Sequence, residues 1–399
     1  MPFEGVSIVK IRLALFAGSV ALRVVTWLVL AELSGSDAPN LSLFFDGHIY
    51  QLIAQTFPHP YQYIHSLFPQ FPKSPTYLTA WFPGYPLIIW TANWAVHDLR
   101  MAALVVSWIA SGLAVVAFYE LARRMTDRPL AAAAIFTFLP PEWLLCGSLA
   151  FVEPLFVGLF IATMAFFVAG RRNAAIAVAG LTIVSQKTGI LVLPVLFLSI
   201  WNGSLKNTVR VFLPYLAALL PLAALQAYLW LVFSDPIINF ATHRRVFGGS
   251  YFSLPFLSLA SGLLEAHSAL PGLFWTRKLM TFGSVVFYAG TWAWCWRKRT
   301  PEETPLLVWL GVVTAFAVSL AGSWGYYAFA RLCVVAAPPA LLLWARRTRA
   351  PLARFWPALV LLAPLVVLYD AFAALGHLEL WSRLWSPRYL ALVVHHFAS

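Results

Sequence analysis

The sequence predicts an all-α bundle of transmembrane helices. Of its 399 residues, 61% are hydrophobic and only 11% are charged, whereas an ordinary soluble domain has about 25% charged residues. The apolar residues also form runs that are apolar on every face and long enough to cross a hydrocarbon core of about 30 Å. Such runs include Leu13–Leu33, Ala102–Ala122, Leu149–Ala169 and Phe355–Leu375.

Counting the apolar runs predicts about eleven crossings within a single membrane domain, residues 1–399. Loops rich in lysine and arginine tend to stay in the cytoplasm. All the basic clusters fall on one side if the segment Ala80–Val96, with its prolines, is re-entrant or interfacial. The N-terminus is then inside and the C-terminus outside. The clusters are Lys10/Arg12, Arg123/Arg124/Arg128, Arg171/Arg172, Lys206/Arg210, Arg297/Lys298/Arg299 and Arg346/Arg347/Arg349/Arg354.

Two long loops consequently face the outside, residues 34–97 and residues 234–276. Long loops in compact proteins usually carry function. The first loop is rich in aromatic residues, prolines and histidines, which suit the membrane interface. We expect short interfacial helices there.

Asp46 lies in this first loop, in the sequence LSLFFDGHIYQLIA. A carboxylate at this place can take a proton from an acceptor hydroxyl, with space for the substrate beside Gly47. The alternative is that Asp46 caps a short helix running from His48 to Gln55.

Glu153 and Lys187 are ionisable residues in or between apolar segments. An ionisable group is costly in a membrane and marks function by default. Glu153 is expected to bind sugar hydroxyls or a cation, or else to make a structural hydrogen bond. Lys187 lies between two short helices, Ala174–Ser185 and Thr188–Trp201, and suits a phosphate.

A second basic group lies on the side predicted to be outside. His243, Arg244 and Arg245 are adjacent there, against the usual distribution of positive charge, and anion binding is a reason for their presence. Arg331 begins a late crossing, preceded by Tyr326 and Tyr327. It either binds an anion or extends to the lipid headgroups.

The sequence indicates no metal and no cofactor. The histidines of the first loop, His48, His59 and His65, lack the spacing of a metal site. There is also no Walker loop, no dinucleotide-binding glycine motif and no GxSxG motif. A sugar donor would therefore not be a cytosolic nucleotide.

The order of the motifs FFDGHIYQLIA, WFPGYPL, SLAFVEPLF, SQKTGIL, HRRVFGGSYFSLP and ARLCVVAAPPALLL resembles the PIG-V type mannosyltransferases. That family belongs to the polytopic GT-C glycosyltransferases. Its W-D-x-x-x-Y element is matched by Phe45, Asp46 and Tyr50, with Phe in place of Trp. Its F-F-P-x-x-P element is matched by Trp81, Phe82, Pro83 and Pro86. Its S-E-S-L-F element is matched at Glu153, its R-x-N-G element loosely at Lys187, and its late arginine by Arg331.

The resemblance implies an inverting GT-C enzyme of a bacterial plasma membrane rather than of the endoplasmic reticulum. It would transfer a mannosyl or other hexosyl group from a polyprenyl-phosphate sugar to a lipid-linked or protein acceptor on the non-cytoplasmic face. Asp46 would be the general base. The donor phosphate would meet the cations Lys187, His243, Arg244, Arg245 and Arg331. The substrates would contact Tyr50, Phe82, Pro83, Tyr85, Glu153, Tyr326 and Tyr327.

Two other classes remain open from the sequence. A transporter or lipid flippase would use Glu153 and Lys187 as intramembrane sites, although the chain shows no inverted repeat. An accessory subunit would keep the fold without the activity.

Overall fold

The computed structural model describes residues 7–246, 252, 254–257, 259–260, 271–320, 331, 333–347, 364–369 and 387–398. These residues form helices and, apart from an isolated bridge between Phe252 and Leu320, no β-structure. The all-α prediction is confirmed. Tyr326, Tyr327, much of the loop 234–276 and most of the run Phe355–Leu375 lie outside the described residues.

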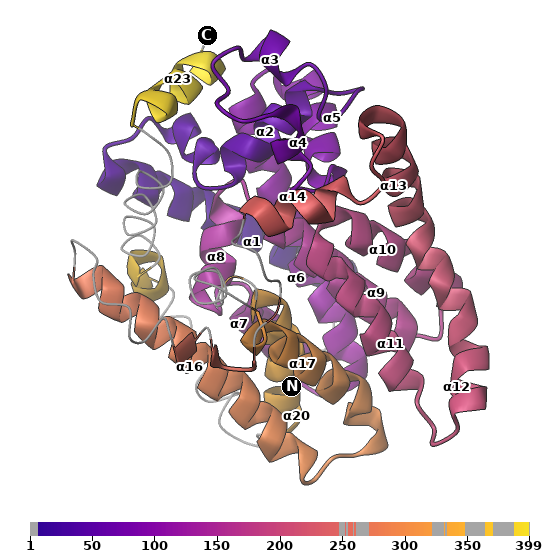
Figure 1. Cartoon of the computed structure of the whole chain (residues 1–399). Coiled ribbons are helices and arrows are strands. Elements are labelled where there is room, and N and C mark those ends of the chain that lie inside the picture. Colours follow the sequence, from indigo (N-terminus) through magenta and orange to yellow (C-terminus); the bar gives the residue numbers. More distant parts are fainter. Residues whose placement is uncertain are drawn as a thin grey trace.

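The first half of the chain contains α1 to α11 (Figure 1). The elements are α1 (Ile8–Ser34), η1 (Ala38–Leu43), α2 (Gly47–Gln55), α3 (Ile64–Leu67), α4 (Pro75–Leu78), α5 (Gly84–Val96), α6 (Leu99–Met125), α7 (Pro129–Phe136), α8 (Pro141–Ser148), α9 (Glu153–Val168), α10 (Arg172–Ser185), η2 (Lys187–Leu191) and α11 (Val192–Ile200). The second half adds α12 (Leu205–Phe212), η3 (Leu213–Leu219), α13 (Leu220–Phe233), α14 (Ile238–Val246), α16 (Pro271–Trp296), η4 (Pro301–Glu303), α17 (Thr304–Val318), η5 (Cys333–Ala336), α20 (Ala337–Arg347) and α23 (Pro387–Ala398).

Four helical segments among the described residues are long and apolar enough to cross a membrane: Ile8–Ser34, Leu99–Met125, Leu205–Phe233 and Pro301–Val318. The helices α7 and α8 together are also long and apolar enough for a fifth span, which would be broken because the two helices are bent by 63° to one another. The predicted runs Leu13–Leu33 and Ala102–Ala122 lie inside α1 and α6. The count of eleven crossings stays a prediction.

One predicted span needs correction. The run Leu149–Ala169 is not one helix, because α8 ends at Ser148 and α9 begins only at Glu153. Pro154, the second residue of α9, has no N–H and suits the first turn of a helix. Glu153 is therefore the first residue of α9 rather than a residue inside it, and its carboxylate lies at the positive end of the helix dipole.

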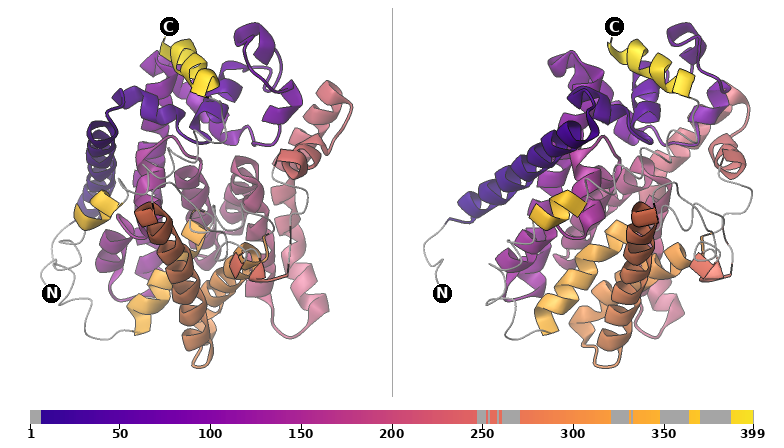
Figure 2. Two further views of the ribbon diagram at one scale, coloured as in Figure 1. Left: turned by 60° about the vertical axis from the view of Figure 1, so that its left-hand side comes forward. Right: turned by 90° about the vertical axis from the view of Figure 1, so that its left-hand side faces the viewer.

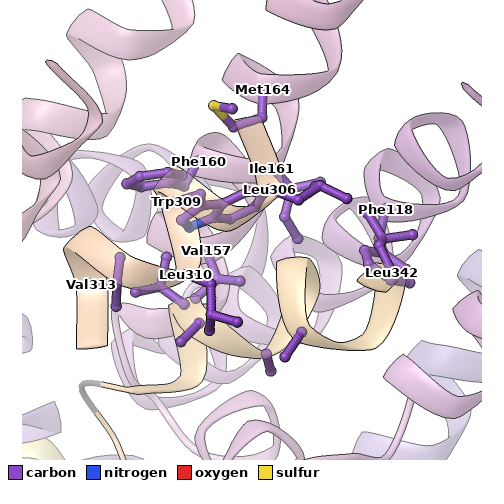
Figure 3. Packing of buried hydrophobic residues seen from close by; sticks show 14 of the residues in the cluster. Phe118, Val157, Phe160, Ile161, Met164, Leu306, Trp309, Leu310, Val313 and Leu342 are labelled. Atoms are coloured by element: carbon purple, nitrogen blue, oxygen red, sulfur yellow. The ribbon is translucent and has the colours of Figure 1, made fainter. Parts of the chain in front are cut away.

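The main hydrophobic core joins helices from both halves of the sequence (Figure 3). Trp309 of α17 stacks on Phe160 of α9 with 5.0 Å between ring centroids. Gly158 lets α9 approach α6, since a Cβ there would lie 3.1 Å from the Cβ of Ala114. Small residues allow such close packing, which is how helices associate where lipid is as apolar as their side chains.

A second core holds together one end of the bundle, which we call the loop end: η1, α2 to α5 and α23 (Figures 1 and 2). The helix α23 packs on this end, where His396 bonds Gln55 at 2.9 Å and stacks on Phe68. Residues far apart in sequence thus pack together at the loop end.

The opposite end of the bundle carries basic residues from several elements. Arg12 at the start of α1 pairs with Glu120 near the end of α6. Arg346 of α20 donates to the carbonyl of Met125 at 2.9 Å and pairs with Glu302. Clusters predicted to share a side of the membrane therefore meet at the same end. That this end faces the cytoplasm stays a prediction.

Candidate functional site

A tight turn positions Asp46 at the loop end. Phe45 has φ = 54°, a left-handed conformation that is uncommon for a residue with a side chain. Gly47 follows, and a Cβ at this position would overlap the carbonyl oxygen of Ser42. Only glycine lets the two backbone segments approach this closely. His48 holds the turn, with its Nδ1 2.7 Å from the carbonyl oxygen of Phe45.

Asp46 occupies the N-cap position of α2, but its side chain makes no capping hydrogen bond. The carboxylate turns instead to Arg331, whose Nη2 lies 2.8 Å from Oδ2 of Asp46. Capping, which was the structural alternative for this residue, is not what its side chain does.

Arg331 bridges two carboxylates. Its Nε donates to Oε1 of Glu153 at 2.5 Å, while its Nη2 holds Asp46. Two aromatic rings flank the guanidinium, that of Phe151 at 4.6 Å and that of Phe45 at 5.6 Å from its central carbon. Such rings attract a cation and fix its plane. We name this group, Asp46, Arg331 and Glu153, the carboxylate centre.

The members of the carboxylate centre differ in depth. The Glu153 side chain is 3% exposed, that of Arg331 16% and that of Asp46 20%. The sequence showed each residue separately as a candidate, but their contact joins positions 178 residues apart in the case of Glu153 and Arg331. Asp46 is the member that an incoming substrate can reach most easily.

Tyrosines form a wall beside the carboxylate centre. Tyr50 and Tyr85 meet edge to face, with 5.1 Å between centroids, and the Tyr85 hydroxyl is 2.8 Å from Ser107 Oγ. Tyr77 of α4 is close enough to Asp46 to feel its charge. Burial, followed by this negative charge, raises the pKa of Tyr77. No motif in the sequence around Tyr77 predicts this position.

Lys187 forms a second charged group. It begins η2, and Gly189 allows the turn there, because a Cβ at Gly189 would overlap the carbonyl of Thr182 in α10. The Lys187 ammonium donates to the carbonyl oxygen of Asn239 at 3.1 Å and lies 5.8 Å and 5.9 Å from the rings of Phe82 and Phe240.

No carboxylate neutralises Lys187 among the ion pairs of the described residues. Asn239 is 1% exposed, and its Nδ2 donor has no hydrogen-bond partner in the described part of the chain. His243 is close enough to Lys187 to feel its charge. Burial, followed by this positive charge, lowers the pKa of His243 to about 3. We name Lys187, Asn239 and His243 the lysine centre.

The remaining predicted residues fall in different places. Phe82 and Tyr85 belong to the same hydrophobic cluster as Tyr50, and the Phe82 ring also lies beside the Lys187 ammonium. Pro83 is the N-cap residue of α5. Arg244 and Arg245 are exposed on α14, whereas His243 is half-buried. Of these three adjacent basic residues, His243 is therefore the one assigned to the lysine centre.

The sequence matches no protein-family model and no curated protein. Similar solved structures do exist. ArnT from Cupriavidus metallidurans, crystallised bound to undecaprenyl phosphate, has 15% identity and a TM-score of 0.53, with 96% of this chain and 77% of that chain covered. The apo crystal structure of the same ArnT gives 16% identity, 96% and 76% coverage and a TM-score of 0.49.

The likeness to the ligand-bound ArnT shows the fold. This chain has a GT-C type fold of membrane helices. The narrower resemblance to the PIG-V type enzymes, seen in the sequence motifs, stays a prediction.

Proposed function

We propose that the chain is a membrane glycosyltransferase that takes a sugar from a polyprenyl-phosphate donor and transfers it to a lipid-linked or protein acceptor. The observation that carries the proposal is a GT-C type fold, shared with a protein crystallised with undecaprenyl phosphate, that brings a carboxylate and partly buried cations to one end. Sequence motifs favour mannose as the sugar.

Asp46 is the proposed general base. It removes the proton of an acceptor hydroxyl while that oxygen forms a bond to the anomeric carbon of the sugar. The bond from this carbon to the donor phosphate breaks at the same time, and polyprenyl phosphate leaves with the electron pair. Attack from the face opposite to the phosphate inverts the anomeric configuration. Asp46 suits the role because it is the most exposed member of the carboxylate centre.

The donor phosphate is proposed to bind near Lys187. The Lys187 ammonium is partly buried and has no carboxylate partner among the described residues, whereas buried ions normally have a counter-charge. The Nδ2 donor of Asn239, which has no hydrogen-bond partner in the described part of the chain, is available to the same anion. Cations of this kind stabilise the negative charge that develops on a leaving phosphate. Glu153, Tyr50 and Tyr85 would border the sugar, and Arg244, Arg245 and the tyrosines Tyr326 and Tyr327 remain proposed contacts.

The loop end is proposed to face the non-cytoplasmic side of a bacterial plasma membrane. The basic residues gathered at the opposite end support this orientation, because lysine and arginine accumulate on the cytoplasmic side. The prenyl chain of the donor would lie along the apolar helices in the lipid.

The proposal predicts that Asp46→Asn abolishes sugar transfer. The amide cannot accept the acceptor's proton, so transfer from radiolabelled polyprenyl-phosphate mannose should fall by about 100-fold or more. The measurement is labelled product formed by purified protein in lipid vesicles. Asp98→Asn is the matched control, because Asp98 caps α6 and pairs with Arg100 away from the carboxylate centre. Undiminished transfer by Asp46→Asn would refute the general-base assignment, and flux of donor without transfer would favour a flippase.

A further inference from the structure

Two nitrogens of the Arg331 guanidinium are held unequally. Nε contacts Glu153, which is 3% exposed and lies in the first turn of α9. Nη2 contacts Asp46, which is 20% exposed and follows the left-handed turn at Phe45. The rings of Phe45 and Phe151 lie against the same cation. The Glu153 contact is therefore the anchor, and the Asp46 contact is the one that can be exchanged.

The charges of the carboxylate centre do not cancel. Two carboxylates share one guanidinium, and no other described lysine or arginine forms an ion pair with them. Nη2 of Arg331 is already occupied as a ligand for a phosphate, because it binds Asp46. Oδ2 of Asp46 is occupied by the same contact. In this arrangement neither residue is ready for its proposed role.

We infer that the donor phosphate replaces Asp46 at Nη2 of Arg331, while Glu153 keeps the guanidinium in place through Nε. This inference rests on the proposed function. Arginine suits the exchange, because its five N–H donors can bind a carboxylate and a phosphate at the same time. No covalent bond changes in this step. Its consequence is an order of events: the donor binds first, and only then is Asp46 free to take the proton of the acceptor.

Binding of undecaprenyl phosphate to the purified full-length chain in lipid nanodiscs tests the exchange. Asp46→Asn removes the competing charge, so the dissociation constant should fall by about five- to tenfold. The direction is diagnostic, because damage to the site would weaken binding. Asp98→Asn makes the same chemical change at another ion-paired aspartate and should leave the affinity unchanged.

A second background separates exchange at Arg331 from a general loss of negative charge. Glu153→Gln with Arg331→Gln keeps the net charge and removes the guanidinium. Adding Asp46→Asn to this background should give no tighter binding. An Arg331→Lys background gives the same test if the double variant does not fold, because an ammonium lacks the fork and the gain should shrink.

Three results would count against these ideas in different ways. An unchanged or weaker affinity in Asp46→Asn overturns the exchange and leaves the proposed function standing. An equal gain in the background without Arg331 also overturns the exchange, because long-range charge then explains it. Absence of binding by the unsubstituted chain removes the polyprenyl-phosphate donor itself, and the exchange falls with the proposed function.

Discussion

The carboxylate centre and the lysine centre lie at the same part of the bundle but balance their charges in opposite ways. Arg331 is held by two carboxylates, at 2.8 Å and 2.5 Å. Lys187 has a backbone carbonyl and two aromatic rings around it, and none of the ion pairs among the described residues includes it. Among the described residues, the cation of the first centre is paired with carboxylates, whereas the cation of the second has no carboxylate partner.

The different charge balance indicates that Arg331 stabilises the fold, whereas Lys187 is available to bind an anion. Removing one partner from a buried ion pair leaves the other charge uncompensated, which is strongly destabilising. Removing a buried charge that has no counter-ion relieves a desolvation cost. Substitutions in the two centres should therefore change stability in opposite directions, although both should reduce transfer.

The largest effect is expected for Arg331→Ala. Two carboxylates would be left without a cation, and the free energy of unfolding should fall by about 3–5 kcal/mol. Thermal unfolding in detergent measures the change. Arg123→Ala is the control, because the Arg123 and Glu120 side chains are 36% and 29% exposed, and pairs exposed in this way contribute less than about 1 kcal/mol. Equal losses from the two variants would contradict a buried, interdependent carboxylate centre.

The next effect is expected for Lys187→Met, and it should separate stability from activity. Stability should stay the same or rise by up to about 1 kcal/mol, since methionine fills a similar volume without a charge. Transfer should fall by about 100-fold, as when a donor to a developing anion is removed. Lys206→Met, at an exposed lysine of α12, should change neither quantity. A large loss of stability in Lys187→Met would show that the lysine is a structural residue.

The smallest effect is expected for Gly47→Ala. The added Cβ would displace the carbonyl of Ser42 and move the turn that carries Asp46, lowering stability by about 1–3 kcal/mol. Gly18→Ala in α1 is the matched control, because no atom lies within 4 Å of its added Cβ and alanine favours a helix. Transfer rates and unfolding temperatures of both variants provide the measurement. If Gly47→Ala behaved like Gly18→Ala, the tight turn would not matter.

Much of the fold could be predicted, because long apolar runs in a sequence indicate membrane helices. The runs inside α1 and α6 were visible as apolar segments, since a helix is the simplest way to satisfy its backbone in lipid. The break between α8 and α9 was missed, because the residues around Leu149 are as apolar as those of a helix. Only Pro154 signals the new start.

The charged residues were predictable one by one, but their partnerships were not. Asp46, Glu153, Lys187 and Arg331 stand out because charges are rare in this sequence. Pairing depends on which helices pack together, and no local pattern encodes that. Arg331 was expected to bind phosphate directly, whereas the structure shows it bound by carboxylates. The contribution of Tyr77 depends on where α4 packs, and the sequence around it contains no signal for this.

The long sequence separation within the carboxylate centre has a consequence for biosynthesis. Asp46 and Glu153 are translated early, and Arg331 follows 178 residues after Glu153. The early helices must therefore enter the membrane before their neutralising cation exists. A nascent chain released before Arg331 would carry two acidic groups without this cation, a feature by which membrane quality control can distinguish unfinished molecules from complete ones.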